Sequence, residues 1–404
     1  MNSEYNTARP QWEIFCQVVD NYGDIGVCWR LARDLALRTG TAVRLWVDDW
    51  SALQRICPQA SGLNDKAGGR VDGVELRRWN STSCSAAEWN SAPTAVEPGA
   101  IVIEAFACTL PETHLQAMLG QHPRPLWINL EYLSAEPWVA ACHGMASPHP
   151  RLGLLKHFFF PGFDGHTGGL LRESALLQRR DAFRNEPAGR KAWLARRGIA
   201  LGDDDDETLC VSLFAYAQAG LPALLQAWSL GQRRLHLLVP EGRMLEAVCS
   251  ALGSTLLPVG ERLSRASLVV HALPFTDQDG YDELLWACDL NFVRGEDSFV
   301  RAQWAGRPFV WHIYSQDENA HRPKLEAFMS RYVAGLNLQT AAALKAFWQA
   351  WNGCGDTVEA WSDFAAALPT LRAHAEHWCS ERAAQKDLVS ALIAFCAHSQ
   401  IASG

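Results

Sequence analysis

Short apolar runs alternate with helix-like runs along nearly the whole of this 404-residue chain. Such alternation predicts parallel β-sheets with helices on both faces. The expected strands are residues 12–19, 42–47, 100–106 and 125–130 in the first half, and residues 208–214, 235–239, 268–273, 290–293 and 308–313 in the second. Expected helices include residues 221–228, 244–252, 281–287 and the Ala/Leu/Trp-rich stretch 341–401.

A polar region separates the two halves of the pattern. Residues 172–197 are charged and helix-prone, and the acidic run 202–207 that follows is typical of a solvated loop rather than a metal site. The length also favours two domains. We therefore expect an α/β fold of the GT-B type, with two Rossmann-like domains facing a central cleft. Their expected bounds are 1–180 and 181–365, followed by a helical tail, 366–404, that packs back on the N-terminal domain.

Composition excludes several classes of protein. A formal charge of −8 argues against a general nucleic-acid binder, which would present a basic face. No apolar run reaches transmembrane length, and the N-terminus has no signal-peptide core. Twelve Cys occur without Cys-x-x-Cys spacing, and thirteen His lack metal-ligand spacing, so neither disulfides nor a zinc site are expected. The expected location is the reducing cytoplasm, with no membrane partner.

The loop at residues 20–26 (DNYGDIG) joins the first expected strand to a helix. Ligands of open α/β sheets bind at the carboxyl ends of strands, and this loop places Asp20 and Asp24 there. N–H groups at a helix start favour anions, so we expect a lowered pKa that keeps both carboxyls ionised. Such a pair suits the binding of a cation or the acceptance of a proton.

A dinucleotide site is an alternative interpretation of the same loop. Asp48 and Asp49, which end the second strand, lie at a suitable distance to bind a ribose hydroxyl. However, only Gly23 and Gly26 of a Gly-x-Gly-x-x-Gly pattern are present, and Asp24 would direct a charge at the pyrophosphate. No Gly-x-x-x-x-Gly-Lys sequence occurs either, which excludes a P-loop.

Three motifs of the second half also follow expected strands. Asp277 and Asp279 match the Asp-x-Asp pattern of some metal-dependent sugar-nucleotide enzymes, but we interpret them as caps of the following helix and predict no metal. Residues 294–299 form a second strand–turn–helix loop, whose N–H groups and Ser298 hydroxyl could bind a diphosphate. Glu296 should then point toward a cationic group. The polar loop 314–321 could bind phosphate or sugar oxygens, or be an ordinary surface loop.

Together these motifs resemble the EarP family, the protein-arginine rhamnosyltransferases that act on translation elongation factor P. The resemblance spans the chain from about residue 12 and rests on residues 16–33 (CQVVDNYGDIGVCWRLAR), 128–136 (INLEYLSAE), 159–163 (FFPGF), 291–298 (NFVRGEDS) and 311–316 (WHIYSQ). It implies an inverting, metal-independent GT-B enzyme that moves L-rhamnose from dTDP-β-L-rhamnose to one arginine of elongation factor P. That modification would activate the factor for rescue of ribosomes stalled at polyproline. The donor is a substrate, and no cofactor is implied.

The resemblance also assigns residues. The matching catalytic acids are Asp20, Asp24 and Glu296. The expected nucleotide-sugar-binding residues are Phe214 and Phe275 near the thymine, Gln278 beside that base, and Asp297, Ser298, Tyr314, Ser315 and Gln316 around the ribose and diphosphate. The chemistry agrees with this assignment, because carboxylates can hold a guanidinium bidentately and take its proton as the C–N bond forms.

Two other functions stay open. A GT-B transferase with a carbohydrate or small-molecule acceptor would share the donor site. A binding module for elongation factor P without catalysis would not need Asp20, Asp24 and Glu296, and their presence argues against it. An acidic, aromatic-rich face near residues 129–136 would favour a protein acceptor over a sugar.

Overall fold

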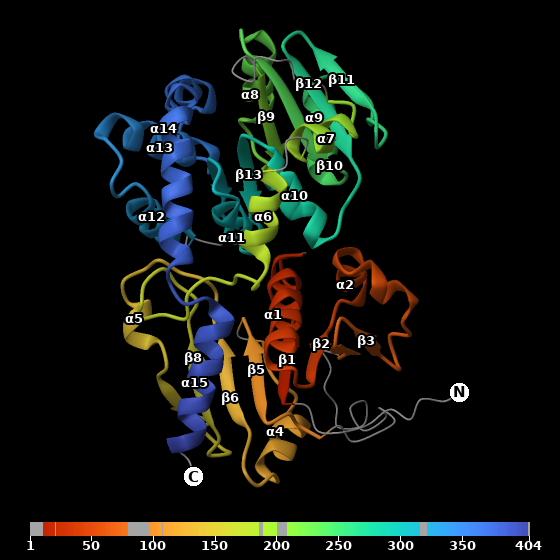
Figure 1. Cartoon of the computed structure of the whole chain (residues 1–404), viewed down its shortest axis with the longest axis vertical. Helices are drawn as coiled ribbons and strands as arrows, with labels where there is room; N and C mark the ends of the chain where they lie inside the picture. The colour runs from red at the N-terminus through yellow and green to blue at the C-terminus, as the bar shows by residue number, and fades with distance from the viewer. Residues whose placement is uncertain are drawn as a thin grey trace. The chain divides into compact units, whose positions relative to one another are not determined.

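The computed structural model describes residues 11–20, 22–79, 97–106, 108–185, 189–199, 208–315 and 321–402. The chain divides into two compact units, unit 1 (Met1–Glu173 with Gln385–Gly404) and unit 2 (Ser174–Ala384). Each contains a mostly parallel sheet with helices, which confirms the expected α/β class (Figure 1). The units part at Glu173 and Ala384, whereas the sequence suggested 180 and 365. No helix of the described residues is long and apolar enough to cross a membrane.

Unit 1 is built on an eight-stranded sheet of order β3-β4-β2-β1-β5-β6-β8-β7, in which the two edge strands are antiparallel and the rest parallel. Its strands are β1 (Trp12–Cys16), β2 (Val43–Val47), β3 (Gly69–Val71), β4 (Val74–Arg78), β5 (Ile101–Ala105), β6 (Leu126–Leu130), β7 (Ala146–Pro148) and β8 (Leu155–Phe159). The four expected strands are β1, β2, β5 and β6. The other four were not predicted.

The helices of unit 1 are α1 (Gly23–Thr39), α2 (Trp50–Ile56), the 3-10 turn η1 (Pro58–Gly62), α4 (Glu112–Leu119), α5 (Val139–Cys142) and α15 (Leu388–Ala402). The last of these, α15, is the end of the chain returning to the first sheet (Figure 1). There the Phe395 ring packs edge-on against that of Phe159 in β8. The start of α15 is fixed by Asp387, which accepts from the Ser390 N–H and pairs with Arg38 at the end of α1.

Unit 2 is built on a six-stranded sheet of order β11-β12-β10-β9-β13-β14, parallel except for β11. Its strands are β9 (Thr208–Leu213), β10 (Arg234–Pro240), β11 (Arg262–Arg265), β12 (Leu268–Leu273), β13 (Leu290–Arg294) and β14 (Phe309–His312). Its helices are α6 (Leu176–Asn185), α7 (Gly189–Ala195), α8 (Leu221–Leu230), α9 (Arg243–Ala251), α10 (Gln278–Ala287), α11 (Asp297–Ala305), α12 (His321–Tyr332), α13 (Leu338–Trp351) and α14 (Thr357–Ala383). All five strands expected in this half are present, and β11 was missed.

Candidate functional site

The turn between β1 and α1 is fastened by Asp24. This residue lies in the first turn of α1 and is only 3% exposed. Its Oδ2 accepts the backbone N–H groups of Val19 at 2.8 Å and of Asp20 at 2.9 Å. The Asp24 carboxyl therefore holds the loop that carries Asp20, and Asp20 itself is only partly buried. The two acids of this loop thus lie in different environments.

Two aromatic residues complete the surroundings of Asp24. The Tyr132 hydroxyl donates to Asp24 Oδ1 at 3.2 Å, and the Tyr132 ring stacks on Phe106 with centroids 4.5 Å apart. Tyr132 follows β6 and Phe106 follows β5, whereas Asp24 belongs to the turn after β1. Because parallel strands end on the same edge, three neighbouring strands meet at this carboxyl group.

Burial raises the pKa of Asp24, and the neighbouring Asp20 adds to the rise. The hydrogen bonds from the backbone and from Tyr132 act in the opposite direction but do not outweigh the loss of hydration. Our expectation of a lowered pKa at the helix start is therefore wrong for Asp24. It neglected burial, which cannot be read from the loop sequence.

Asp48 and Asp49 serve the fold locally. Asp48 Oδ1 accepts the N–H groups of Val18 at 2.9 Å and of Asp49 at 2.8 Å, tying the end of β2 to the loop after β1. Asp49 is the N-cap of α2 and accepts from the N–H groups of Ser51 and Ala52. Both carboxylates are thus used within the turn, which removes the main support for a ribose-binding role.

The segment after β6 carries acidic and aromatic side chains on the same edge of the unit 1 sheet. Glu131 accepts from Asn129 Nδ2 at 2.6 Å, and Glu136 accepts from the Ser134 hydroxyl at 2.9 Å. Trp138 is 50% exposed, a large fraction for an indole ring. An acidic, aromatic-rich face near residues 129–136 is the feature named above as favouring a protein acceptor over a sugar, and Trp138 lies just beyond that range.

In unit 2, the corresponding edge presents an arginine. Arg294 ends β13, and its guanidinium lies 4.4 Å from the ring centre of Phe214 and 4.9 Å from that of Tyr216. Both aromatic residues follow β9, the strand next to β13. The guanidinium also donates to the Ala215 carbonyl at 3.5 Å. Of this cluster, the sequence analysis singled out only Phe214.

The Ser298 side chain links the start of α11 to the end of β13. Its hydroxyl accepts the Arg294 N–H at 3.0 Å and donates back to the Arg294 carbonyl. Gly295 adopts a positive φ of 59°, which a glycine takes without strain, and its carbonyl accepts from the Trp311 indole at 2.8 Å. Glu296 is the N-cap residue and Asp297 begins the helix, both partly exposed. The turn is therefore fixed before any ligand is considered.

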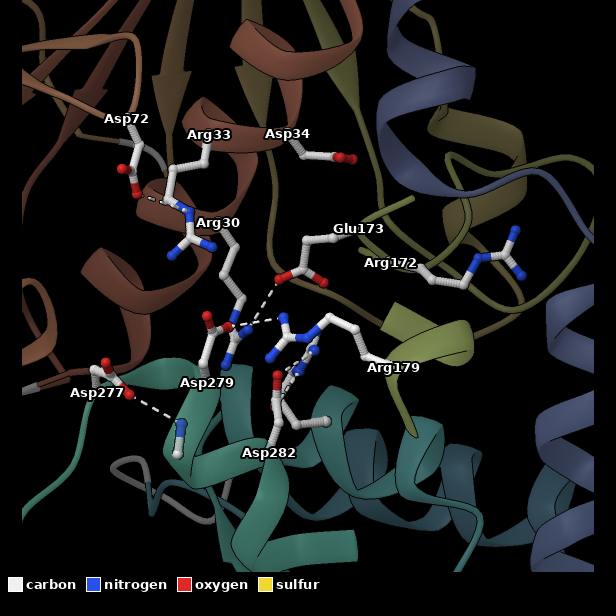
Figure 2. Close-up of polar contacts among 12 residues, drawn as sticks. Arg30, Arg33, Asp34, Asp72, Arg172, Glu173, Arg179, Asp277, Asp279 and Asp282 are labelled. Atoms are coloured by element: carbon white, nitrogen blue, oxygen red, sulfur yellow. Dashed lines mark hydrogen bonds and ion pairs between the residues drawn. The ribbon is translucent and has the colours of Figure 1, made fainter. Parts of the chain in front are cut away.

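The aspartates at the start of α10 have different roles (Figure 2). Asp277 is the N-cap and accepts the Gly280 N–H at 2.9 Å. Asp279 instead pairs with Arg179 of α6 at 3.0 Å, with both side chains about half exposed. The expected cap is therefore confirmed for Asp277 and wrong for Asp279. No group of three or more His, Cys, Asp or Glu in the described part of the chain is arranged to hold a metal ion.

The remaining predicted residues that the structure describes follow strands of the unit 2 sheet. Phe275 follows β12 and is partly exposed, and Gln278 opens α10 and is 5% exposed. Tyr314 follows β14, and its ring lies 5.6 Å from that of Tyr216. Ser315 is exposed. Gln316 lies outside the described residues.

A model of the family described as "Elongation-Factor P (EF-P) rhamnosyltransferase EarP" matches residues 12–397. The chain belongs to the EarP family. Similar relatives include the protein-arginine rhamnosyltransferase of Pseudomonas putida, 49% identical over 96% of this chain and 98% of that protein. The protein of the same name from Neisseria meningitidis serogroup B is 36% identical, over 90% of this chain and 89% of that protein.

The fold agrees with EarP membership. A solved structure described as "Structural basis for EarP-mediated arginine glycosylation of translation elongation factor EF-P" is 36% identical and matches with a TM-score of 0.65. The match covers 97% of this chain and 100% of that one. The chain is thus a glycosyltransferase of the EarP family with the α/β fold that its sequence predicted.

Sequence reasoning missed Arg294 and Tyr216. Arg294 stands inside the quoted motif NFVRGEDS, but attention there went to its acids and hydroxyl. A signal was nevertheless present, because a cation at the start of a helix opposes the helix dipole and so needs another reason to be there.

Proposed function

We propose that this EarP-family chain transfers L-rhamnose from dTDP-β-L-rhamnose to an arginine side chain of elongation factor P, with inversion at the sugar carbon. The family and the names of the relatives support arginine rhamnosylation. The observation that carries the donor half of the proposal is Arg294, a cation held on two aromatic rings beside the start of α11. The same proposal places the protein in the cytoplasm, where translation occurs.

Arg294 suits a diphosphate. It adds positive charge beside the N-terminus of α11, where the helix dipole is also positive and where Glu296 and Asp297 stand. A diphosphate there would meet both the guanidinium fork and the helix-start N–H groups. We place the thymine near Phe214, Phe275 and Gln278. The ribose and diphosphate lie near Asp297, Ser298, Tyr314, Ser315 and Gln316.

Asp20, Asp24 and Glu296 are the proposed catalytic acids. Arginine is a poor nucleophile because its lone pairs are delocalised and its pKa exceeds about 12. A carboxylate that binds one side of the guanidinium can polarise it and accept the proton that leaves as the C–N bond forms. Asp20 is the more accessible of the two acids in unit 1, so we assign it this contact and give Asp24 the task of holding it in place.

Inversion follows from a single attack on the face opposite the diphosphate. The guanidinium nitrogen forms its bond to the sugar carbon as the bond to the diphosphate oxygen breaks. Arg294 and the helix-start N–H groups would stabilise the charge that develops on the departing oxygen. This supply of positive charge is the basis for proposing that no metal ion or other cofactor is required.

Mass spectrometry of intact elongation factor P, incubated with this protein and dTDP-rhamnose, tests the proposal. We expect a gain of one deoxyhexose on one arginine and the same yield in excess EDTA. With an Asp20→Asn variant the gain should be at least about a hundredfold slower. An anomeric assignment by NMR of the product tests inversion. If dTDP-rhamnose is consumed only when a sugar or small molecule is supplied, the alternative of a carbohydrate or small-molecule acceptor is supported instead.

A further inference from the structure

Three arginines of unit 2 lie near the C-terminal end of α11, the end opposite to Arg294. Arg180 and Arg184 both belong to α6, and Arg307 follows the glycine that terminates α11. Arg180 Nη1 donates to the Trp304 carbonyl at 2.8 Å, and Arg184 Nη2 donates to the Ala305 carbonyl. We call Arg180, Arg184 and Arg307 the arginine cluster.

Capping explains part of this arrangement. The last carbonyls of a helix accept hydrogen bonds, and its negative dipole end favours cations, so Arg180 and one nitrogen of Arg184 have an ordinary structural role. Arg307 has no such role. It is 6% exposed, and its Nε and Nη1 are buried with no hydrogen-bond partner among the described residues. The same is true of Arg184 Nε.

The nearby carboxylates do not balance the cluster. Asp181 accepts from Arg180, and Asp289 accepts from Arg190 at 2.7 Å. Glu376, 52% exposed, lies 4.0 Å from Arg307 Nη1 and is shared with Arg372, whose Nε is 3.9 Å away. Guanidinium groups thus outnumber the carboxylates that reach them.

This excess of positive charge has an electrostatic consequence. Burial, reinforced by repulsion from Arg307 and Arg180, lowers the pKa of Arg184 to about 9. Burial and the neighbouring Arg372 lower the pKa of Arg307 to about 10. A buried cation without a full set of partners is strongly destabilising, and a bound anion relieves that cost.

We propose that the arginine cluster is an anion site for a small tetrahedral oxyanion of the phosphate type. Arg307 Nε and Arg184 Nε each donate one hydrogen bond to it, whereas Arg307 Nη1, on the opposite edge of the guanidinium, faces Glu376. Charge-assisted hydrogen bonds from guanidinium groups to phosphate oxygens are stronger than neutral ones. The side chains of Glu376 and Arg372, which neighbour Arg307, are about half exposed to solvent. The nine residues of α11 separate this site from Arg294 by roughly 13 Å, so it is distinct from the proposed donor site.

Thermal unfolding of the full chain in sodium phosphate and in sodium chloride of equal ionic strength tests the proposal. Saturating dTDP is present throughout, so that the donor site is occupied. We compare the wild type with Arg307→Met, and with Arg124→Met, which removes a charge from an exposed position before β6. Calorimetric titration of inorganic phosphate into each protein, again with dTDP present, gives the affinities.

We expect phosphate to raise the Tm of the wild type and of Arg124→Met more than chloride does. Arg307→Met should bind phosphate at least about tenfold more weakly, the loss typical of removing charge-assisted hydrogen bonds. In chloride, Arg307→Met should be as stable as the wild type or more so, because a buried unbalanced cation has been replaced by an apolar chain of similar length.

Two results would overturn the site. One is a phosphate effect no greater than that of chloride on the wild type. The other is a loss of stability in Arg307→Met of the same size in both salts, which would make Arg307 purely structural. Should Arg307→Met not fold, Arg184→Met carries the same expectation of weakened phosphate binding.

Discussion

The β1–α1 turn of unit 1 and the β13–α11 turn of unit 2 use the same local device to present opposite charges. In unit 1 the Asp20 N–H is accepted by the side chain of Asp24, four residues later. In unit 2 the Arg294 N–H is accepted by the side chain of Ser298, also four residues later. In both loops, a side chain at the start of the helix accepts a hydrogen bond from the backbone N–H of the residue four positions earlier.

The two loops differ in the charge of the residue at the strand end and in the chemical group that accepts its N–H. Asp20 is an acid held by a buried acid, whereas Arg294 is a cation held by a neutral hydroxyl and supported by two aromatic rings. Under the proposed function, the first arrangement would attract an acceptor guanidinium and the second a donor diphosphate. We call Asp20 and Arg294 the presenting residues, and Asp24 and Ser298 the fastening residues. The two kinds should respond differently to substitution.

The largest expected effect is on the presenting acid. Asp20→Asn is nearly isosteric but cannot accept a proton, so we expect turnover to fall by at least about a hundredfold. The Tm and the affinity for dTDP should stay at wild-type values. Turnover, melting and calorimetry on the same preparation check this.

Asp24→Asn is the matched variant for that comparison. Its amide oxygen can still accept the two N–H groups that Asp24 Oδ2 accepts. Its NH₂ group, however, replaces the oxygen that accepts from the Tyr132 hydroxyl and adds donors to a buried site. We expect it to lower both the Tm and turnover. Wild-type turnover in Asp20→Asn, or a Tm loss as large as that of Asp24→Asn, would contradict the division of roles.

The next effect is on the presenting cation. Arg294→Lys keeps the charge but loses the planar fork and its stacking on Phe214 and Tyr216, so dTDP affinity should fall by roughly tenfold to a hundredfold. Binding of elongation factor P, which we assign to unit 1, should be unchanged. Ser298→Ala is the matched control for the fastening residue, and it should lower the Tm more than Arg294→Lys does. Calorimetry with each ligand in turn measures the affinities, and equal weakening of both ligands would refute the assignment.

The sequence predicted one presenting residue and missed the other for a physical reason. Asp20 lies in a loop where two acids and two glycines stand out locally, so its position at a strand end could be read directly. The role of Arg294 depends on Phe214 and Tyr216, about eighty residues earlier, which reach it only because β9 pairs with β13. Some of the missed strands were hidden for a different reason. Short edge strands such as β7 and β11 lack the apolar run that reveals a central strand.

A somewhat smaller effect is expected for base stacking in unit 2. Phe275→Ala should weaken dTDP binding by about tenfold or more, since stacking of a base on an aromatic ring contributes roughly 1–3 kcal/mol. Phe275 is not part of either fastened turn, so neither the Tm nor binding of elongation factor P should change greatly. Undiminished dTDP affinity, measured by calorimetry, would remove Phe275 from the donor site.

The two fastening residues should also differ in their response to pH. Because the folded state raises the pKa of Asp24, it binds the proton more tightly than the unfolded chain does. Protonation therefore favours folding, and this contribution is lost as pH rises from the ordinary Asp range through the raised folded value. The free energy of unfolding of the wild type, relative to Asp24→Asn, should decline with pH across that window. Ser298→Ala should show no such dependence relative to the wild type, because a hydroxyl does not titrate there. A flat difference for Asp24, measured by urea unfolding at several pH values, would contradict its raised pKa.

The smallest expected effect concerns Asp277 and Asp279 at the start of α10. This helix start is neither of the two loops compared above. Asp277 caps the helix, so Asp277→Ala should lower the free energy of unfolding by about 1 kcal/mol. Asp279→Ala breaks a half-exposed ion pair with Arg179 rather than a cap, so it should cost less than Asp277→Ala does. Neither variant should lose much turnover, and EDTA should not change the turnover of either, because the donor charge is assigned to Arg294 rather than to a metal. Loss of turnover in Asp279→Ala, together with inhibition by EDTA and rescue by Mn²⁺, would show that this Asp-x-Asp sequence binds a metal and that Arg294 is not sufficient for the diphosphate.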